Sequence, residues 1–447
     1  MEAYVIDPGT LAGIAAIIAA LKGLLAELRK WRRYMERCAC RFPHPLNPID
    51  SRPMRANHAP IKDRSSRLGS LEDTWRPHCT TTARSDAAFE LGALRLTGGA
   101  PSDTVRRPAR TRSFPVAAES LFHTRDDADP AALDGATVAV LGYGNLGRSM
   151  ALNLRDSGLT VVVGNRDDEY RQAAGGDGMD VTDIATAVAR ADVVYVLLAD
   201  EVIPDVYPSD IAPHLQWRSA ICFGSGYVLA FGLATPAADV DVLLLAPRML
   251  GEEVRTRFLD GRGFFSYVSV EQDASGTAEA RLLALALACG TLARGAMRLS
   301  ATQEAHLDLL IEQTVGPYLG TAIQLAFDTG VAHGLPPEAL VLEMYMSGEM
   351  SRTFQTFAEV GFYRSATLHG LVAEYGGFLG TLALDRKEMA RMFAEQARRI
   401  VGGDFAARLQ AEKKAGYPTR AIIEAILKGD DPASQAEVRV REALGGR

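Results

Sequence analysis

The chain has 447 residues, of which 47% are hydrophobic and 23% are charged, which is ordinary for a globular protein of two or three domains. Its formal net charge of −7 is divided unevenly, because residues 1–117 hold 19 Lys and Arg against 11 Asp and Glu, whereas the remainder holds 29 against 44. Five scattered cysteines argue against a disulfide framework or a common zinc finger, and we expect a cytoplasmic protein.

The basic N-terminal region, residues 1–117, differs in kind from the rest of the chain. Its longest apolar run, 11–21, is about half the length of a membrane span, and the acidic Glu2 and Asp7 before it are not typical of a secretory signal. Residues 11–31 can form one amphipathic helix. Residues 32–117 are rich in Arg, Pro, Ser and Thr without helical or strand periodicity, so we expect them to be poorly ordered. A nucleic-acid-binding arm is the alternative, but the arginines are neither clustered nor interleaved with aromatic residues.

From about Leu121 onward, short apolar runs alternate with helical stretches, which predicts an α/β domain with a doubly wound parallel sheet of the Rossmann type. The run that begins at Val138 and the run that begins at Val193 are continuous and rich in β-branched residues, as expected for strands covered on both faces. The six predicted strands are 137–142, 160–164, 192–198, 219–223, 239–245 and 265–270.

Beyond Ala278 the pattern changes to long helices, with apolar residues at helical spacing in 282–288, 307–323 and 337–358. We therefore divide the chain into a poorly ordered extension (1–117), a dinucleotide-binding domain (118–298) and an all-helical domain (299–447).

A glycine motif follows the first long strand. The residues Gly142-Tyr143-Gly144-Asn145-Leu146-Gly147 stand between an apolar run and an apolar helix, and this context makes a short motif specific for a dinucleotide. In such a turn the first glycine permits the bend, the second lets backbone N–H groups approach the pyrophosphate, and the third packs the helix against the strand. All six residues are candidates for binding the cofactor.

The turn after the second long strand bears on which nicotinamide cofactor is used. Asp167 and Asp168 lie about 20 residues beyond the glycines, where carboxylates would repel the 2′-phosphate of NADP. Arg166 has the opposite effect, because a guanidinium can pair with that phosphate. We favour NAD over NADP and keep both.

Three carboxylates in the helical half, Glu304, Asp308 and Glu312, recur every four residues and share one face of a helix. Apolar neighbours make unpaired carboxylates costly there, and oxygen ligands of this kind suit magnesium. On the residues alone, a solvated acidic stripe remains the simpler interpretation.

The chain also resembles ketol-acid reductoisomerase (acetohydroxyacid isomeroreductase) of the short bacterial type, as a divergent member, over about residues 121–440. The matching segments are collinear: Asp126-Asp-Ala-Asp, Gly142-Tyr-Gly-Asn-Leu-Gly, Ala151-Leu-Asn-Leu-Arg-Asp-Ser-Gly158, Leu197-Leu-Ala-Asp-Glu201, Pro236-Ala-Ala-Asp-Val-Asp-Val, Gln272-Asp-Ala-Ser-Gly276, Asp308-Leu-Leu-Ile-Glu-Gln313 and Ala373-Glu-Tyr-Gly376.

The resemblance implies a knotted helical domain, a homodimer or larger homo-oligomer, and two Mg²⁺ ions that assist alkyl migration in a 2-acetohydroxy acid before hydride reduction. It implies that Asp308 and Glu312 are metal ligands and that Asp200 belongs to the cofactor site. Glu343 and Glu349 are the candidates for the carboxylates that a partner subunit contributes. In the family these two carboxylates lie four positions apart in the sequence. Here they lie six positions apart, so we expect a bulge or break at Gly348 to restore their geometry.

Three departures from the family pattern bear on the chemistry. Ser225 stands where the family has a histidine, and its pKa is too high for it to act as a base without help. Arg248 replaces a lysine, which keeps the positive charge but does not readily release a proton. Gly370 takes the place of a serine that contacts substrate. Arg248 and Ser225 nevertheless remain candidate catalytic residues, together with Asp308 and Glu312.

We therefore expect an NAD(P)H- and Mg-dependent ketol-acid reductoisomerase of branched-chain amino-acid synthesis that acts on a small molecule and binds neither nucleic acid nor a membrane. The retained carboxylates favour this hypothesis. The alternatives are a related reductase of another 2-keto acid or imine that does not isomerise, and a catalytically silent paralogue.

Overall fold

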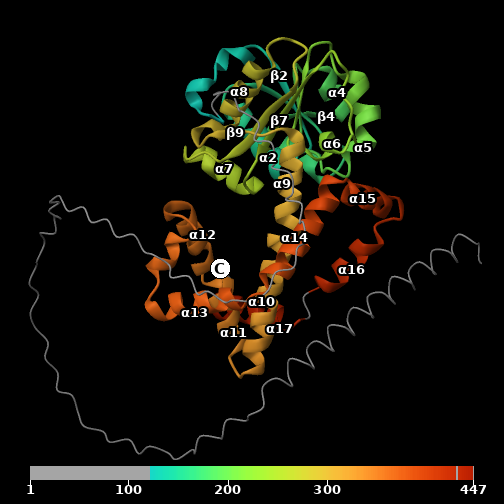
Figure 1. Cartoon of the computed structure of the whole chain (residues 1–447). Coiled ribbons are helices and arrows are strands. Elements are labelled where there is room, and N and C mark those ends of the chain that lie inside the picture. Colours follow the sequence, from blue (N-terminus) through green and yellow to red (C-terminus); the bar gives the residue numbers. More distant parts are fainter. Residues whose placement is uncertain (1–120, 429–430, 446–447) are drawn as a thin grey trace, which may run out of the picture. The chain divides into compact units, whose positions relative to one another are not determined.

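A computed structural model describes residues 121–428 and 431–445 of the chain (Figure 1). The hypotheses about a helix and an arm within residues 1–117 lie outside the described residues. Within the described ranges, no helix combines the length and the apolar character that a bilayer span needs.

One nine-stranded sheet forms the centre of the first half, in the order β1-β9-β8-β7-β6-β5-β2-β3-β4. The six predicted strands are all present, and the α/β fold with a helical second half is confirmed. The strands are β1 (Phe122–His123), β2 (Thr137–Leu141), β3 (Thr160–Gly164), β4 (Asp180–Thr182), β5 (Val193–Val196), β6 (Ala220–Phe223), β7 (Asp241–Pro247), β8 (Ser266–Gln272) and β9 (Ala296–Arg298).

The sheet is mixed rather than parallel throughout. Strands β2 to β7 are parallel to one another, but β8 runs antiparallel to β7, with Pro247 opposite Ser266. Between β7 and β8 the chain turns back at the carboxyl end of β7 through α7 (Gly251–Leu259). This connection does not cross a face of the sheet, as a connection between parallel strands would, and β8 therefore runs antiparallel to β7. Apolar patterning identifies a strand but not its direction, which is why the sequence predicted the strand and missed its orientation.

Helices cover both faces of the sheet, and alternate residues of β2 show this directly. Val138 and Val140 join the core formed with α2 (Asn145–Asp156) and α8 (Ala278–Cys289). Ala139 and Leu141 join the opposite core, which includes residues of α4, α5, α6 and α15 (Figure 1). Because both faces are buried, the central strands read as continuous apolar runs instead of alternating ones.

Helices make up the described chain after Ala301. The first two, α9 (Ala301–Gln313) and α10 (Val315–Ala332), are separated at Thr314, whose backbone leaves helical geometry. The predicted stretch 337–358 is divided as well, into α11 (Pro337–Val341), a π-helical turn η6 (Leu342–Met346) and α12 (Glu349–Val360), with Gly348 at a φ of +83° between the last two. The predicted break at Gly348 is thus confirmed.

The other helical elements are as follows: η1 (Arg125–Asp127), η2 (Pro130–Leu133), α3 (Glu169–Gly176), α4 (Ile184–Ala189), α5 (Ile203–Val206), η3 (Tyr207–Ile211), η4 (Ala212–His214), α6 (Tyr227–Ala230), η5 (Thr291–Ala293), η7 (Arg364–Leu368), α13 (Leu371–Ala383), α14 (Arg386–Val401), α15 (Asp404–Lys414), α16 (Pro418–Ile426) and α17 (Pro432–Ala443).

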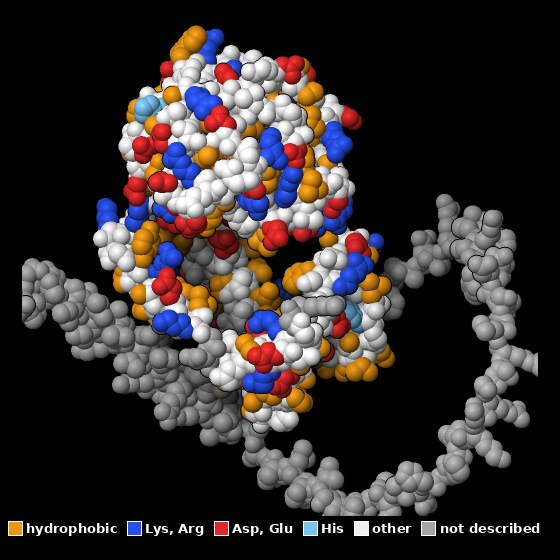
Figure 2. All heavy atoms as spheres, turned by 180° about the vertical axis from the view of Figure 1, so that it is seen from behind, with side chains coloured by type: hydrophobic (Ala, Val, Ile, Leu, Met, Phe, Trp, Pro, Cys, Tyr) orange, Lys and Arg blue, Asp and Glu red, His pale blue; other side chains and the backbone are white. Residues whose placement is uncertain are grey.

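The helical half leaves many large apolar side chains exposed, and Figure 2 shows hydrophobic side chains at its surface. Helices α12 and α13 and the segment between them expose the most. The affected residues include Phe354, Phe362, Tyr363, Leu371, Val372, Tyr375, Phe378 and Leu382. Exposed apolar side chains gathered on neighbouring elements are typical of an interaction surface.

Candidate active site

The glycine turn has the geometry that its sequence predicts. Gly142 adopts a φ of +93°, and a Cβ on it would lie 2.8 Å from the carbonyl oxygen of Leu197. A Cβ on Gly147 would lie 2.1 Å from the carbonyl oxygen of Gly142, so only glycine lets α2 approach β2 this closely. Gly144 is the N-cap of α2, and nothing lies within 4 Å of its Cβ position. The open space at this helix N-terminus fits a dinucleotide pyrophosphate.

The other members of the motif differ in what they can offer a cofactor. Tyr143 is buried in the core, its hydroxyl donates to Asp177 at 3.0 Å, and its N–H donates to the Asn165 side chain at 3.1 Å. Its side chain is therefore a structural anchor of the turn. Asn145 and Leu146 form the first turn of α2, where backbone N–H groups lack intrahelical acceptors and are free for phosphate oxygens.

The two aspartates of the turn after β3 differ in their contacts. Asp168 is the N-cap of α3, accepts hydrogen bonds from the N–H groups of Tyr170 and Arg171, and pairs with Arg166 at 2.6 Å. Arg166 and these N–H groups lower the pKa of Asp168. Asp167 is exposed and makes no hydrogen bond or ion pair with another described residue. Of the two carboxylates, Asp167 is thus the one left to meet an adenine ribose.

Arg248, at the carboxyl end of β7, joins two of the three α9 carboxylates. Its Nη2 donates to Glu304 at 2.9 Å and its Nη1 donates to Asp308 at 2.6 Å. Glu304 is 1% exposed, and its second oxygen accepts the N–H of Gly226 at 2.7 Å. Burial raises the pKa of Glu304 despite these partners. The cluster therefore fixes α9 against the carboxyl ends of β6 and β7.

Glu304 is the residue that sequence reasoning undervalued. A solvated acidic stripe was the simpler interpretation of the α9 carboxylates, yet only the later members reach solvent: the Asp308 side chain is 43% exposed and Glu312 is exposed. Partial burial and the nearby Asp308 raise the pKa of Glu312. The sequence signal for a buried Glu304 was weak, because its partners lie 56 and 78 residues away.

A second polar group lies at the ends of β5 and β6. The Ser225 hydroxyl donates to Asp200 Oδ2 at 3.0 Å and accepts the N–H of Tyr227 at 3.2 Å. Burial raises the pKa of Asp200 to about 6. The buried Tyr227 hydroxyl has no hydrogen-bond partner among the described residues.

The metal ligands expected from a partner subunit are not brought to α9 within one chain. Glu343 lies in η6 and Glu349 begins α12, and the described residues contain no group of three His, Cys, Asp or Glu side chains placed to hold a metal ion. Asp308 and Glu312 still fit a hard cation, because they are neighbouring oxygen donors open to solvent. Two carboxylates would fill only part of the coordination of such a cation.

Two family models match almost the whole described chain. Residues 132–295 match the NADPH-binding domain of acetohydroxy acid isomeroreductase, and residues 302–444 match the C-terminal domain of ketol-acid reductoisomerase. The chain belongs to the ketol-acid reductoisomerase family. It is accordingly an NAD(P)-dependent oxidoreductase of ketol-acid reductoisomerase type that acts on a small molecule.

Relatives within the ketol-acid reductoisomerase family support the assignment along most of their length. A putative ketol-acid reductoisomerase 3 of Saccharolobus solfataricus is 38% identical over 65% of this chain and 89% of its own. A ketol-acid reductoisomerase (NADP(+)) of Pyrobaculum neutrophilum is 35% identical over 73% and 99%. The solved structure of an NADH-preferring ketol-acid reductoisomerase from an uncultured archean aligns with a TM-score of 0.68 at 31% identity, covering 72% of this chain and 98% of that one.

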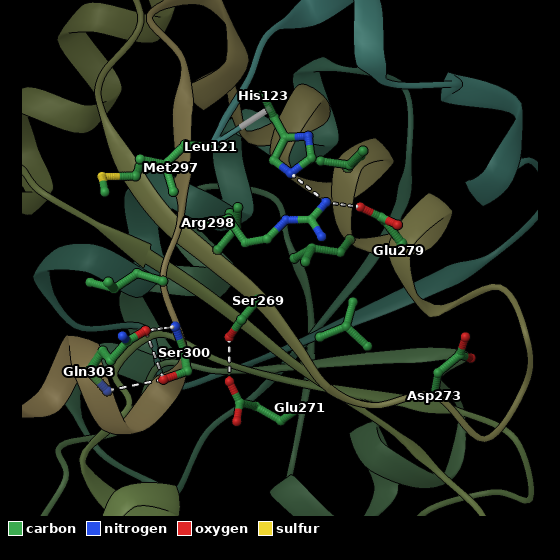
Figure 3. Close-up of a pocket in the computed structure, with 15 residues that line it drawn as sticks. Leu121, His123, Ser269, Glu271, Asp273, Glu279, Met297, Arg298, Ser300 and Gln303 are labelled. Carbon is green, nitrogen blue, oxygen red and sulfur yellow. Dashed lines mark hydrogen bonds and ion pairs between the residues drawn. The ribbon is translucent and has the colours of Figure 1, made fainter. Parts of the chain in front are cut away.

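A further cavity lies apart from these ketol-acid reductoisomerase site residues, across β1, β8, β9 and α8 (Figure 3). Its volume is about 680 Å³, and none of the predicted site residues lines it. Arg298 pairs with Glu279, Glu271 accepts from Ser269, and Asp273 accepts two backbone N–H groups. Each of these charged groups thus has at least one partner within the chain.

Proposed function

We propose that the protein is a ketol-acid reductoisomerase that converts a 2-acetohydroxy acid into a 2,3-dihydroxy acid by alkyl migration and NAD(P)H-dependent reduction, as in branched-chain amino-acid synthesis in the cytoplasm. The observation that carries the proposal is the Arg248–Glu304–Asp308 cluster. It connects α9, which bears the candidate metal ligands, to the strand ends of the dinucleotide-binding sheet. Substrate held by α9 would thus face a nicotinamide held by the sheet.

Within this proposal, Asp308 and Glu312 hold two Mg²⁺ ions together with the partner subunit's Glu343 and the partner subunit's Glu349. Bound there, the ions would polarise the substrate ketone and stabilise the charge that develops on oxygen. The chain's own residues orient the carboxylates of α9. Gly226 and Arg248 fix Glu304, and Arg248 sets the direction of the Asp308 carboxylate. The cation of Arg248 also favours the anionic form of a substrate oxygen nearby.

We propose NAD(H) as the preferred cofactor, held by Gly142, Gly144, the first turn of α2, and Asp167. The exposed carboxylate of Asp167 supports this, since it would repel a 2′-phosphate. A preference for NADH in the archean relative agrees, whereas the name of the Pyrobaculum relative gives NADP(+).

We propose a homodimer or a larger homo-oligomer. The exposed apolar side chains of α12 and α13 support this assembly, because a second copy would cover them, and so does the incomplete carboxylate set of one chain. Light scattering on the purified protein tests the assembly: a monomer at micromolar concentration would contradict it.

One assay tests the reaction. Purified protein is incubated with Mg²⁺, NADH or NADPH, and either 2-acetolactate or the isomerised 3-hydroxy-2-keto acid. The proposal expects nicotinamide oxidation with both substrates, abolished by a chelator with 2-acetolactate and restored by added Mg²⁺. Oxidation only with the isomerised acid would overturn the isomerase and leave a reductase. The observation that favours this second candidate is that Arg248 holds Asp308 Oδ1 at 2.6 Å, which leaves this candidate ligand with one oxygen, Oδ2, for a metal ion.

A further inference from the structure

Asp200 and Ser225 occupy the half of the sheet that a nicotinamide ring would cover. In the strand order, β3 and β4 lie on one side of β2, and β5, β6 and β7 lie on the other. A dinucleotide crosses the carboxyl ends of the strands at this reversal of order, with its adenine half toward β3. Asp200 follows β5 and Ser225 follows β6, so both stand beneath the opposite half.

The contacts of Ser225 connect Asp200 to the α9 cluster. Ser225 lies next to Gly226, whose N–H is bound by Glu304, and Glu304 shares Arg248 with Asp308. A substrate placed between Asp308 and the nicotinamide would therefore lie near the Ser225 hydroxyl. Ser225 is partly exposed, whereas Glu304 is buried, so a substrate can reach the Ser225 hydroxyl but not the Glu304 carboxylate.

We propose that Asp200 supplies, through Ser225, the proton that the substrate carbonyl oxygen takes up when the nicotinamide delivers hydride. The inference rests on the reduction half of the proposed function. In this role Asp200 is a positioning residue and proton source, and Ser225 is the group that meets the substrate.

The step balances as follows. Hydride leaves C4 of NAD(P)H and forms a bond with the carbonyl carbon, while the π electron pair of the carbonyl moves to its oxygen. That oxygen takes the proton of the Ser225 hydroxyl, and the Ser225 oxygen takes the proton of the Asp200 carboxyl. The products are the alcohol, NAD(P)⁺ and an Asp200 carboxylate, which regains its proton from water.

The hydrogen-bond capacity of Ser225 fits this relay. A hydroxyl has two acceptor positions and one donor. When Asp200 is protonated, its hydrogen and the Tyr227 N–H fill both acceptor positions, so the Ser225 hydrogen is left for a third partner. When Asp200 is ionised, the same hydrogen turns to Asp200 Oδ2, which lies 3.0 Å from the Ser225 oxygen.

The charges around Asp200 favour its protonated form. Glu201 on its own loop and Glu304 and Asp308 on α9 all raise its pKa, and the loss of solvation on burial is the largest cause. The neutral phenol of Tyr227 faces it from α6. The cation Lys413 on α15 reaches this loop too, but it binds the Glu201 carbonyl and Asp205. A carboxyl that ionises near pH 6 is suited to donate and regain a proton close to neutral pH.

The test measures reduction of the 3-hydroxy-2-keto acid, which requires no isomerisation, by the full chain between pH 5 and 9. D200N keeps the shape of the side chain and a hydrogen-bond donor toward Ser225 but has no proton to give. We expect its kcat at pH 7 to fall about 100-fold with KM changed less than about threefold. The wild-type hydride-transfer rate should decline above pH 6, and D200N should lose this pH dependence. D200E should restore part of the rate and the pH dependence.

Two variants complete the design. S225A should lose as much activity as D200N, and the double variant should lose no more, because both interrupt one relay. E201Q leaves the proton source in place but removes one charge that raises the pKa of Asp200, so it should move the decline in rate to lower pH without abolishing it. A D200N protein with wild-type kcat and pH profile would overturn the relay, and so would one that only binds NADH more weakly. Failure of the proposed function is distinguished by the wild type: it is overturned if 2-acetolactate is not converted, whatever D200N does.

Discussion

Arg248 lies 2.6 Å from Asp308 and at the same time 2.9 Å from Glu304, so one guanidinium bridges side chains one turn apart on α9. The two carboxylates differ in solvation, since the Glu304 side chain is 1% exposed and that of Asp308 is 43% exposed. Glu304 has the N–H of Gly226 as its other partner. The positive charge of Arg248 is therefore what makes a buried, ionised Glu304 tolerable, and its contact with Asp308 adds direction more than stability.

Replacing Arg248 should consequently destabilise the fold as well as the reaction. R248A leaves the Glu304 carboxylate buried without a cation, and we expect the free energy of unfolding to fall by about 3 kcal/mol in urea titrations. R248A/E304Q should recover more than half of that loss, because the buried charge is removed with its partner. Equal stability of R248A and the wild type would show that Glu304 does not depend on this ion pair.

Asp200 should make the free energy of unfolding depend on pH. Its pKa in the folded protein is about 6, above the ordinary value of 3.8, so the folded state binds more protons than the unfolded state between these values. Stability contributed by this group is therefore present below pH 4 and lost as pH rises through 6, by at most about 3 kcal/mol. The difference in unfolding free energy between D200N and the wild type should grow in favour of D200N from pH 4 to pH 7. A constant difference across this range would contradict the raised pKa.

The glycine turn could be predicted from the sequence, whereas the burial of Glu304 could not. Strand, turn and helix around Gly142 to Gly147 are adjacent in the chain, and the need for glycine at each position is local steric chemistry. The burial of Glu304 depends on Arg248 and Gly226, which only the sheet order brings to α9. The residue pattern within α9 gives no indication of partners that lie so far away in the sequence.

Short elements escaped sequence analysis for a different reason. Strands β1, β4 and β9 have two or three residues each, too few to show a period of two. The break of the predicted helix at Thr314 was missed because its apolar spacing continues on both sides. The break at Gly348 was predicted, since a misplaced carboxylate spacing coincided with a glycine able to adopt positive φ.

The turn after β3 should control the choice of cofactor through Asp167 and not through Asp168. D167N removes an exposed carboxylate that has no other partner among the described residues. We expect KM for NADPH to fall about tenfold, because the 2′-phosphate is no longer repelled, and KM for NADH to rise, because the ribose loses a carboxylate acceptor. D168N removes the N-cap of α3 and the partner of Arg166, so it should reduce stability by about 1 kcal/mol and weaken both cofactors. Steady-state kinetics with each cofactor measures the first effect and thermal unfolding measures the second. An unchanged ratio of the KM values for NADPH and NADH in D167N would remove Asp167 from the cofactor site.

Three glycines should separate the folding role of the motif from its binding role. In G147A the new Cβ would lie 2.1 Å from the Gly142 carbonyl oxygen, so α2 must move and the melting temperature should drop by several degrees. In G144A the Cβ meets no protein atom within 4 Å but enters the space proposed for the pyrophosphate. Its melting temperature should stay near that of the wild type, while the affinity for NADH, measured by calorimetry, falls at least about tenfold. G175A, in open space on α3, is the matched control: it should leave the affinity for NADH unchanged and should not lower the melting temperature, because alanine favours a helix more than glycine does. Tight NADH binding by G144A would place the phosphates elsewhere, because a methyl group at the centre of the turn could not then be in their way.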